Sequence, residues 1–295
     1  MAGTGTIMHS NGDLSHVVVT PSRGESNFLP DLIDSMTKQT LTPTNWVIVI
    51  HNSGQRSLDL LNKACNEHNW ISTISINDGS QRKRGGQIAK LVNKGLSTTK
   101  SDWNFFSKID ADMILPEDYF ECIFAEFGDS EQLGITSGTC YLTEKGKKVR
   151  EKTSRDHTRG GLKTYRRECY DQINGINETD GWDGIDNIVA QMHGWETRSI
   201  PELEVLHQRR TGSSSGLLSG CFESGKFAHS MGYFPPFMLA RSIHRMSSKP
   251  IFFGGVSMLI GYLYSVMAGN KESIRPEVKK FLRNKQKNKL MPWRK

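Results

Sequence analysis

The sequence predicts an α/β protein with a Rossmann-like, mostly parallel sheet flanked by helices and a helical C-terminal extension. Short β-branched runs alternate with segments whose apolar residues recur at helical spacing throughout residues 16–212, and this alternation favours parallel strands with helices on the faces of the sheet. A Ser- and Gly-rich link, 213–223, then separates this domain from a basic, partly apolar tail, 224–295. Residues 1–15 are small and polar and are predicted to form a flexible N-terminus.

Each predicted strand is a short apolar run bounded by turn-forming residues. The strands are expected at 16–20, 46–50, 71–76, 103–109 and 133–139, with two shorter ones at 195–200 and 203–206. The predicted helices carry apolar residues three and four apart, at 29–36, 58–65, 88–96, 116–127, 167–173 and 185–192. The strongly charged segment 144–167 contains Gly160-Gly161 and is predicted to be a loop or an edge hairpin.

Positive charge is concentrated at the C-terminal end of the chain. From Arg241 onward there are 13 Lys and Arg residues against two acids, whereas the first 240 residues have 25 against 29. A localised basic tail indicates a polyanionic partner, either nucleic acid or an anionic membrane surface. The five cysteines lack Cys-x-x-Cys spacing, so neither a zinc site nor a disulfide framework is expected, and a reducing, cytoplasmic environment fits.

The tail contains a charge-free run, 250–270, which is close to the roughly 20 residues that span a bilayer. It holds four glycines and has cations on both sides, whereas a spanning helix usually shows a one-sided charge bias. An interfacial or re-entrant helix is therefore preferred to a true span. A buried core helix is the third alternative.

The main chemical signal is Asp110-Ala111-Asp112, which directly follows the apolar strand 103–109. A turn at the end of a strand lets both carboxylates reach one centre. Carboxylate oxygens suit Mg²⁺ or Mn²⁺, and such an ion bridges phosphate oxygens. The basic, glycine-rich loop 80–86, which includes Arg84, is either a solvated surface loop or a further contact for phosphates.

In this order, the segments resemble the family 2 glycosyltransferases, whose catalytic domain has the nucleotide-binding GT-A fold. The resemblance covers about the first 210 residues and is carried by the first strand with its turn (18–25), the helix ending (38–40), the metal motif (109–112) and the acidic motif (181–186). The tail is similar to C-terminal extensions of bacterial members that act on lipid-linked or cell-envelope glycans.

The resemblance implies an inverting, metal-dependent transfer of a sugar from a nucleotide-diphosphate sugar to a hydroxyl of a glycan or lipid-linked acceptor. Mn²⁺ or Mg²⁺ is the implied cofactor; a UDP-sugar is the favoured donor, with GDP- and dTDP-sugars as alternatives. The implied place of action is cytoplasmic, at the inner face of the cell membrane. Donor contacts are expected from Pro21, Arg23, Glu25, Asn52, Arg84, Lys90, Asp110, Ala111 and Arg209. The second strand departs from the family pattern, because His51-Asn52-Ser53-Gly54 stands where acid-acid-Gly-Ser is usual, and Asn52 is the expected substitute.

Two carboxylates compete for the role of general base. Aligning Gly181-Trp182 with the family pattern selects Asp186, whereas counting back from Gly194 selects Asp183, which also suits a helix N-cap. Asp186 is preferred. The resemblance also implies that Asp112 and His207 bind the metal, and Trp182 either stacks on the acceptor sugar or belongs to the core.

Two other functions remain as alternatives. A nucleotidyltransferase of similar fold would use the same two aspartates, but such enzymes usually have a longer, glycine-rich loop after the first strand than Pro21-Ser22-Arg23-Gly24. A non-enzymatic nucleic-acid-binding protein would use the basic tail, but Phe281 and Trp293 are the only aromatic residues among its final cations. Nucleic acid is therefore an unlikely partner.

Overall fold

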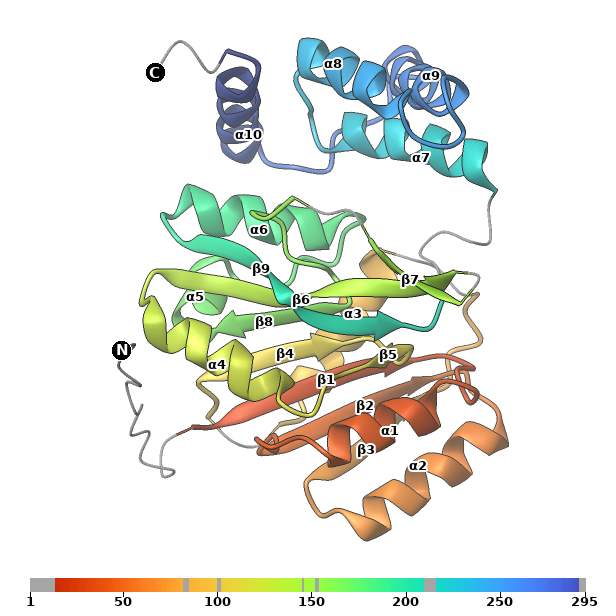
Figure 1. The fold of residues 1–295 in the computed structure, drawn as a ribbon, viewed down its shortest axis with the longest axis vertical. Helices are drawn as coiled ribbons and strands as arrows, with labels where there is room; N and C mark the ends of the chain where they lie inside the picture. Colours follow the sequence, from red (N-terminus) through yellow and green to blue (C-terminus); the bar gives the residue numbers. More distant parts are fainter. Residues whose placement is uncertain are drawn as a thin grey trace.

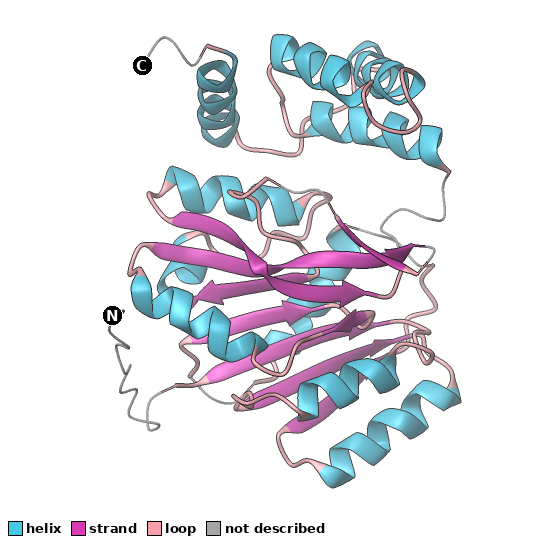
Figure 2. Ribbon diagram, in the orientation of Figure 1, coloured by secondary structure: helices cyan, strands magenta, loops and turns pink. Residues whose placement is uncertain are grey.

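The computed structural model describes residues 14–81, 85–99, 102–144, 146–151, 154–209 and 216–291 of the 295-residue chain. Most of the predicted flexible N-terminus, 1–15, and the loop residue Arg84 lie outside these ranges. One mixed sheet forms the centre of the molecule, with helices on both of its faces and four further helices at one end (Figures 1 and 2). The predicted α/β class with a helical extension is confirmed.

The sheet has the strand order β3-β2-β1-β4-β8-β6-β9-β5, and β7 pairs with β6. The first four strands are parallel: β3 (Ile71–Ile76), β2 (Asn45–His51), β1 (His16–Ser22) and β4 (Phe105–Ile109). Strand β8 (Leu162–Arg166) lies antiparallel to β4 and also to β6 (Leu133–Glu144). Strand β9 (Glu196–His207) runs parallel to β6, and β5 (Met113–Ile114) and β7 (Lys147–Arg150) are short antiparallel additions.

Alternation of side chains along β1 divides the core into two layers. Val18 faces a cluster that includes α1 (Leu29–Thr37), α2 (Gln55–Glu67) and α4 (Tyr119–Asp129). Val17 and Val19 face the other cluster, which includes α3 (Gly86–Leu96), α5 (Arg167–Gln172) and α6 (Trp182–Met192). Parallel strands covered on both faces read as continuous apolar runs, which explains why their positions were visible in the sequence.

Two segments differ from the sequence-based expectation. The charged segment 144–167 supplies β8, a strand inside the sheet, as well as the edge strand β7. The two short strands expected at 195–200 and 203–206 form one strand, β9. Strand β9 passes through Pro201 at a register shift between its pairs with Ser137 and Thr139, so the missing proline N–H falls where the ladder is already interrupted.

The C-terminal extension consists of α7 (Leu217–Ser230), α8 (Pro235–Arg245), α9 (Phe253–Met267) and α10 (Pro276–Leu290). Helix α7 begins inside the expected 213–223 link, so the link is shorter than its composition indicated. Met231 and Val278 join the apolar cluster of α6, and α6 therefore lies between the sheet and the extension (Figure 1). Across the described residues, no helix combines the length and the apolar character that crossing a bilayer requires.

Candidate active site

The two aspartates at the end of β4 have different surroundings. Asp112 is almost fully buried, with 4% of its surface exposed, whereas the side chain of Asp110 is 31% exposed and accepts a hydrogen bond of 2.5 Å from the buried Lys108. The Asp110 N–H donates to the carbonyl of Gly161 at 2.9 Å. Ala111 between them is buried. Asp110 therefore faces open space on a fixed backbone, and Asp112 faces an internal cluster.

That internal cluster brings together the expected metal residues and one expected phosphate contact. Asp112 Oδ2 lies 2.9 Å from Arg209 Nη2 and 3.6 Å from His207 Nε2. Arg209 also reaches Glu25 at 3.3 Å, and Glu25 accepts the Arg23 N–H at 2.8 Å. Pro21 lies in β1 just before this turn and is buried. The ends of β1, β4 and β9 therefore meet at one place, where the donor contacts were expected.

Histidine 207 is held between two carboxylates. Its Nδ1 lies 3.5 Å from Glu151 Oε2, and Arg159 also pairs with Glu151. Burial opposes protonation of His207, but the nearby carboxylates of Asp112 and Glu151 outweigh it and raise its pKa from 6.5 to about 9. Burial also raises the pKa of Asp112, and the neighbouring His207 and Arg209 more than reverse that effect, so its pKa is lowered overall.

The donor atoms of Asp112 and His207 fit a divalent cation. One carboxylate oxygen and one imidazole nitrogen are close enough to share an ion, and the second ring nitrogen faces a carboxylate, as is usual for a metal-binding histidine. The Arg209 guanidinium would have to leave Asp112 Oδ2, where it now supplies the positive charge. A second arrangement, Cys140 with Glu151 and His207, fits less well, because burial raises the pKa of the Cys140 thiol to about 12.

The glycine pair Gly160-Gly161 separates Asp110 from Asp183. A Cβ on Gly161 would lie 2.8 Å from Asp110 Oδ2, and a Cβ on Gly160 would lie 2.9 Å from Asp183 Oδ2. Both carboxylates thus pack against the same short stretch of backbone, which has no side chain to hold them apart. The carboxylate of Asp183 is half-buried and accepts no hydrogen bond from the described residues.

Asp183 is also not the helix N-cap. That position belongs to Gly181, with φ of 82°, and no side chain caps α6. Asp183 instead stands in the first turn of the helix, where the helix dipole favours a negative charge.

Asp186 has a contrasting environment. Its side chain is 2% exposed, one oxygen pairs with the buried Lys163 and accepts the Asn187 N–H, and the other accepts the Tyr165 hydroxyl. Lys163 also donates to the backbone carbonyl of Asp183 at 2.5 Å. Burial lowers the pKa of Lys163, against the opposing charges of Asp186 and Asp183. Asp183 is therefore the more exposed of the two carboxylates, and Asp186 is enclosed by its hydrogen-bond partners.

Trp182 is a core residue in the structure. It is 4% exposed, and the ammonium groups of Lys108 and Lys163 each lie 5.6 Å from its ring centroid. The ring thus stabilises two buried cations and offers little surface to an acceptor sugar.

A polar cluster at the ends of β2 and β3 lies beyond the first-strand turn. Asp78 Oδ1 accepts hydrogen bonds from His51 Nε2 at 2.9 Å, from Asn52 Nδ2 at 3.0 Å and from the Ser80 N–H at 3.0 Å. Arg23 donates to the Ser80 carbonyl. The Ser80 backbone hydrogen bond, followed by those from the side chains, lowers the pKa of Asp78. Asp78 therefore supplies a carboxylate next to Asn52, which had been expected to substitute for the missing acid.

Four further residues that line or support the site had no predicted role: Asp78, Lys108, Glu151 and Lys163; Gly160 was expected only to belong to a loop or hairpin. A usable signal existed for Asp78, because the carboxyl ends of neighbouring parallel strands meet at one sheet edge. Of the remaining predicted donor contacts, Lys90 is exposed on α3, with no hydrogen bond or ion pair to the cluster among the described residues.

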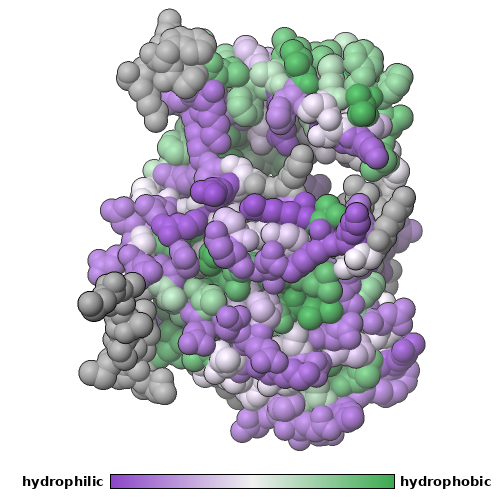
Figure 3. Space-filling model, viewed as in Figure 1, coloured by the Kyte–Doolittle hydropathy of each residue, from purple (hydrophilic) through white to green (hydrophobic). Residues whose placement is uncertain are grey.

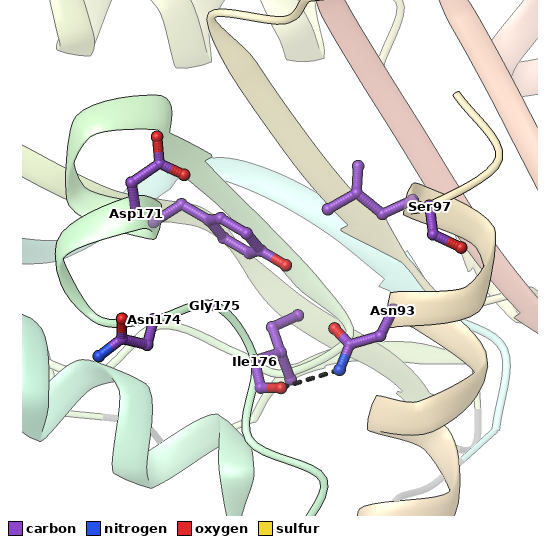
Figure 4. A pocket seen from close by; sticks show the side chains of 8 residues that line it. Asn93, Ser97, Asp171, Asn174, Gly175 and Ile176 are labelled. Carbon is purple, nitrogen blue, oxygen red and sulfur yellow. Dashed lines mark hydrogen bonds between the residues drawn. The ribbon is translucent and has the colours of Figure 1, made fainter. Parts of the chain in front are cut away.

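Two cavities lie on the α5 and α6 side of the sheet, and Asp186 is part of the lining of one of them. One, of about 550 Å³, lies between α3 and α5 and is lined by residues such as Asn93, Tyr170 and Asn174 (Figure 4). The other, of about 410 Å³, lies between Ile173–Val189 and the 273–278 segment before and within α10. Neither includes Asp112, His207 or Asp183, so the site is recognised by its convergent side chains rather than by cavity volume.

The fold is that of the GT-A glycosyltransferases, and comparisons with known proteins agree. The family model "Glycosyl transferase family 2" matches residues 17–193, so the chain belongs to that family. No curated protein sequence matches it.

Solved structures with a similar fold include S. aureus TarS 1–349, with 13% identity, a TM-score of 0.53, and coverage of 87% of this chain and 73% of that one. The same protein in complex with UDP-GlcNAc gives 14% identity and a TM-score of 0.54 over 91% and 78% of the two chains. The mannosyltransferase PcManGT from Pyrobaculum calidifontis, in complex with GDP-Man and Mn²⁺, has 13% sequence identity and a TM-score of 0.54. The match covers 95% of this chain and 81% of that one. At these identities the likeness concerns the fold.

Proposed function

We propose that this glycosyltransferase moves a sugar from a nucleotide-diphosphate sugar to a hydroxyl group with inversion at the anomeric carbon, and that Asp183 is the general base. The observation that carries the proposal is the position of Asp183 across the Gly160-Gly161 backbone from Asp110. A carboxylate there faces the donor end of the site, and its negative charge has no bound hydrogen-bond donor among the described residues. It can therefore accept the proton of an incoming hydroxyl.

Asp186 then acts as a positioning residue. Its pair with Lys163 and the Lys163 bond to the Asp183 carbonyl tie the first turn of α6 to β8. Because both partners are buried, this tie holds the Asp183 backbone in place while the Asp183 side chain stays accessible.

The diphosphate of the donor would lie beside Asp112, His207 and Arg209. A Mn²⁺ or Mg²⁺ ion held by Asp112 and His207 would supply positive charge to the departing diphosphate. Arg209, displaced from Asp112, would pair with a phosphate oxygen, since a guanidinium forms paired hydrogen bonds with phosphate. Glu25 and Glu151 would keep Arg209 and His207 oriented.

The nucleobase would lie toward Asp78. Its Oδ1 accepts three hydrogen bonds, but Oδ2 accepts none from the described residues, so Oδ2 can accept an N–H of the base. Uracil and guanine both present such an N–H, which supports a UDP- or GDP-sugar and is compatible with a dTDP-sugar. The structural neighbours in complex with UDP-GlcNAc and GDP-Man support the same donor classes.

The acceptor would be a hydroxyl of a glycan or a lipid-linked glycan, with transfer on the cytoplasmic side of a membrane. The exposed apolar surface of the extension supports the lipid-linked choice.

A donor screen tests the proposal. Nucleoside diphosphate release is measured for UDP-, GDP- and dTDP-sugars, with and without Mn²⁺ or Mg²⁺, for the wild type and for Asp112→Ala. We expect release that depends on the metal and falls at least roughly a hundredfold in the variant. Equal activity of Asp112→Ala in every productive condition would remove the metal assignment, and release of pyrophosphate instead would favour the nucleotidyltransferase alternative.

A further inference from the structure

The C-terminal extension has an unusual distribution of exposed apolar side chains. Sixteen large apolar residues are exposed in the described part of the chain, and thirteen of them lie between residues 217 and 267. In Figure 3 the hydrophobic colour gathers at the top of the molecule, over α8 and α9. Scattered exposed apolar residues are normal in soluble proteins, but a gathered patch of this kind marks an interaction surface.

The side-chain distribution of helix α9 is the reverse of that in a helix of a soluble bundle, where the large apolar residues are buried. Its buried face consists mainly of small residues, which are Gly254, Gly255, Gly261 and Ser265, together with Met258 and Tyr262. Its opposite face carries exposed Phe253, Ile260, Leu263, Tyr264 and Met267, with Met267 80% exposed. At 100° per residue, these five exposed side chains share one side of the helix.

The glycines explain how this inversion is built. A Cβ on Gly225 of α7 would lie 1.9 Å from the Met258 carbonyl oxygen. A Cβ on Gly261 of α9 would lie 2.1 Å from the Phe222 carbonyl oxygen. The backbones of α7 and α9 therefore pack directly on each other, and the large side chains are left on the outside. Small residues between helices and large apolar ones outward are the arrangement of helices in lipid.

The turn before α9 extends the apolar surface. Ile251, Phe252 and Phe253 are 56–64% exposed, and Leu239 and Ile243 on α8 add an exposed pair one helical turn apart. We name the set Ile251, Phe253, Leu239, Ile243, Leu263 and Met267 the apolar patch.

The charges within the segment that carries most of the patch are all positive, and the acids that flank it, Glu223 and Glu272, are paired with Lys226 and Lys279. Residues 224–271 contain no Asp or Glu. Arg241, Lys249 and Lys271 are exposed there and form no ion pair with the described residues. A second copy of this chain would place like charges together, whereas negatively charged lipid headgroups complement them.

We propose that the apolar patch and its cations dock the protein on an anionic lipid bilayer, lying at the interface rather than spanning it. The patch residues enter the headgroup and acyl boundary, and the three cations contact lipid phosphates. Helix α7 also touches the start of α6, where a Cβ on Gly181 would lie 2.2 Å from the Phe227 ring. The docked extension thus sits against the helix that carries Asp183, which suits an acceptor held in the membrane.

Vesicle flotation tests the proposal without any assay of sugar transfer, so it can fail while the proposed function stands. The probe is phosphatidylcholine vesicles with about one third phosphatidylglycerol, compared with pure phosphatidylcholine. We expect the full chain to float with the anionic vesicles and much less with the neutral ones. Ile251→Ser with Phe253→Ser should weaken partitioning roughly tenfold or more, and Arg241→Gln with Lys249→Gln should weaken binding to anionic vesicles alone.

Val149→Ser is the matched control, because Val149 is an exposed apolar residue on β7, in the catalytic domain. It should float like the wild type, and thermal unfolding should show that all variants are folded, since only exposed side chains change. The proposal is overturned if the wild type stays with the soluble fraction or if the patch variants float equally well. It is also overturned if ultracentrifugation shows a dimer that the patch variants dissociate while vesicle binding is absent.

Discussion

Replacing Asp183 and Asp186 separately with Asn distinguishes a base from a positioning residue. Asp183→Asn removes a carboxylate that accepts no hydrogen bond from the described residues, so the free energy of unfolding should change by only about 0.5 kcal/mol or less. If Asp183 is the base, kcat should fall roughly 10²- to 10⁴-fold, with little change in donor binding.

Asp186→Asn should act mainly on stability. The substitution leaves the Lys163 ammonium, whose side chain is 0% exposed, without its counter-charge. Breaking a buried pair by removing one partner costs about 3–5 kcal/mol, and for a chain of this size that lowers Tm by roughly 6–10 °C. Activity should fall as well, because Lys163 also holds the Asp183 carbonyl.

The pH dependence of the Asp186→Asn variant follows from the same contact. Asp186 raises the pKa of Lys163 against the lowering by burial, so its loss should lower that pKa further. The unfolded chain then binds the Lys163 proton more readily than the folded chain, and stability rises with pH. The deficit of Asp186→Asn relative to wild type should therefore shrink at alkaline pH.

The assays are thermal unfolding, isothermal titration of nucleoside diphosphate, and product release under saturating donor. Asp102→Asn is the control, since its side chain is fully exposed. If Asp186→Asn keeps the wild-type Tm and binds donor but loses turnover, the reasoning is refuted and Asp186 is the base.

Three further predictions concern Gly161, His16 and Asp78. Gly161→Ala should lower kcat/KM roughly a hundredfold with little change in Tm, because the new Cβ would press on flexible side-chain ends, including Asp110 Oδ2 at 2.8 Å. Gly54→Ala is the control, since its Cβ would meet nothing within 4 Å. Unchanged kinetics of Gly161→Ala would contradict the geometry. Burial lowers the pKa of His16 from 6.5 to about 3, so below pH 6.5 the unfolded chain gains a proton that the folded chain does not. The free energy of unfolding should therefore fall by about 2 kcal/mol between pH 7 and 5. Urea unfolding of His16→Gln should not show this decrease. Asp78→Asn should raise the donor KM roughly tenfold with kcat unchanged, and a KM equal to wild type for every donor would exclude the base contact.

Much of the fold could be predicted because the parallel strands β1, β2 and β4 are buried on both faces, whereas β3 at the edge was recognised by its recurring isoleucines. Strands such as 46–50 and 71–76 are apolar runs whose ends are marked by turn residues, and the structure has them within one or two residues. Strand β8 could not be found in this way, because Leu162–Arg166 contains two cations and was predicted to belong to a surface loop or an edge hairpin. Its Lys163 is nonetheless fully buried, because the counter-charge comes from Asp186 on a later helix.

The C-terminal extension could likewise be predicted from the sequence only in part. The sequence predicted its basic charge, its charge-free run and its helical character. The inverted packing of α9 was not predicted, because four glycines in an apolar run are compatible with a core helix, a span or an interfacial helix. The close approach of Gly225 to Met258 and of Gly261 to Phe222 packs one face of α9 on α7 and leaves the large side chains of its other face outside.

By itself, the sequence determined the alternation of strands and helices, the Asp-x-Asp at the end of β4 and the pair of acids near residue 185. The family pattern preferred Asp186 to Asp183, but the sequence could not show that their surroundings differ, since residues three apart lie on the same side of a helix. Only the tertiary structure separated them. Strand β8 brings Lys163 and Tyr165 to Asp186, whereas the side-chain-free backbone at Gly160 faces Asp183. The physical reason is that the charge and solvation of a carboxylate depend on partners distant in the chain.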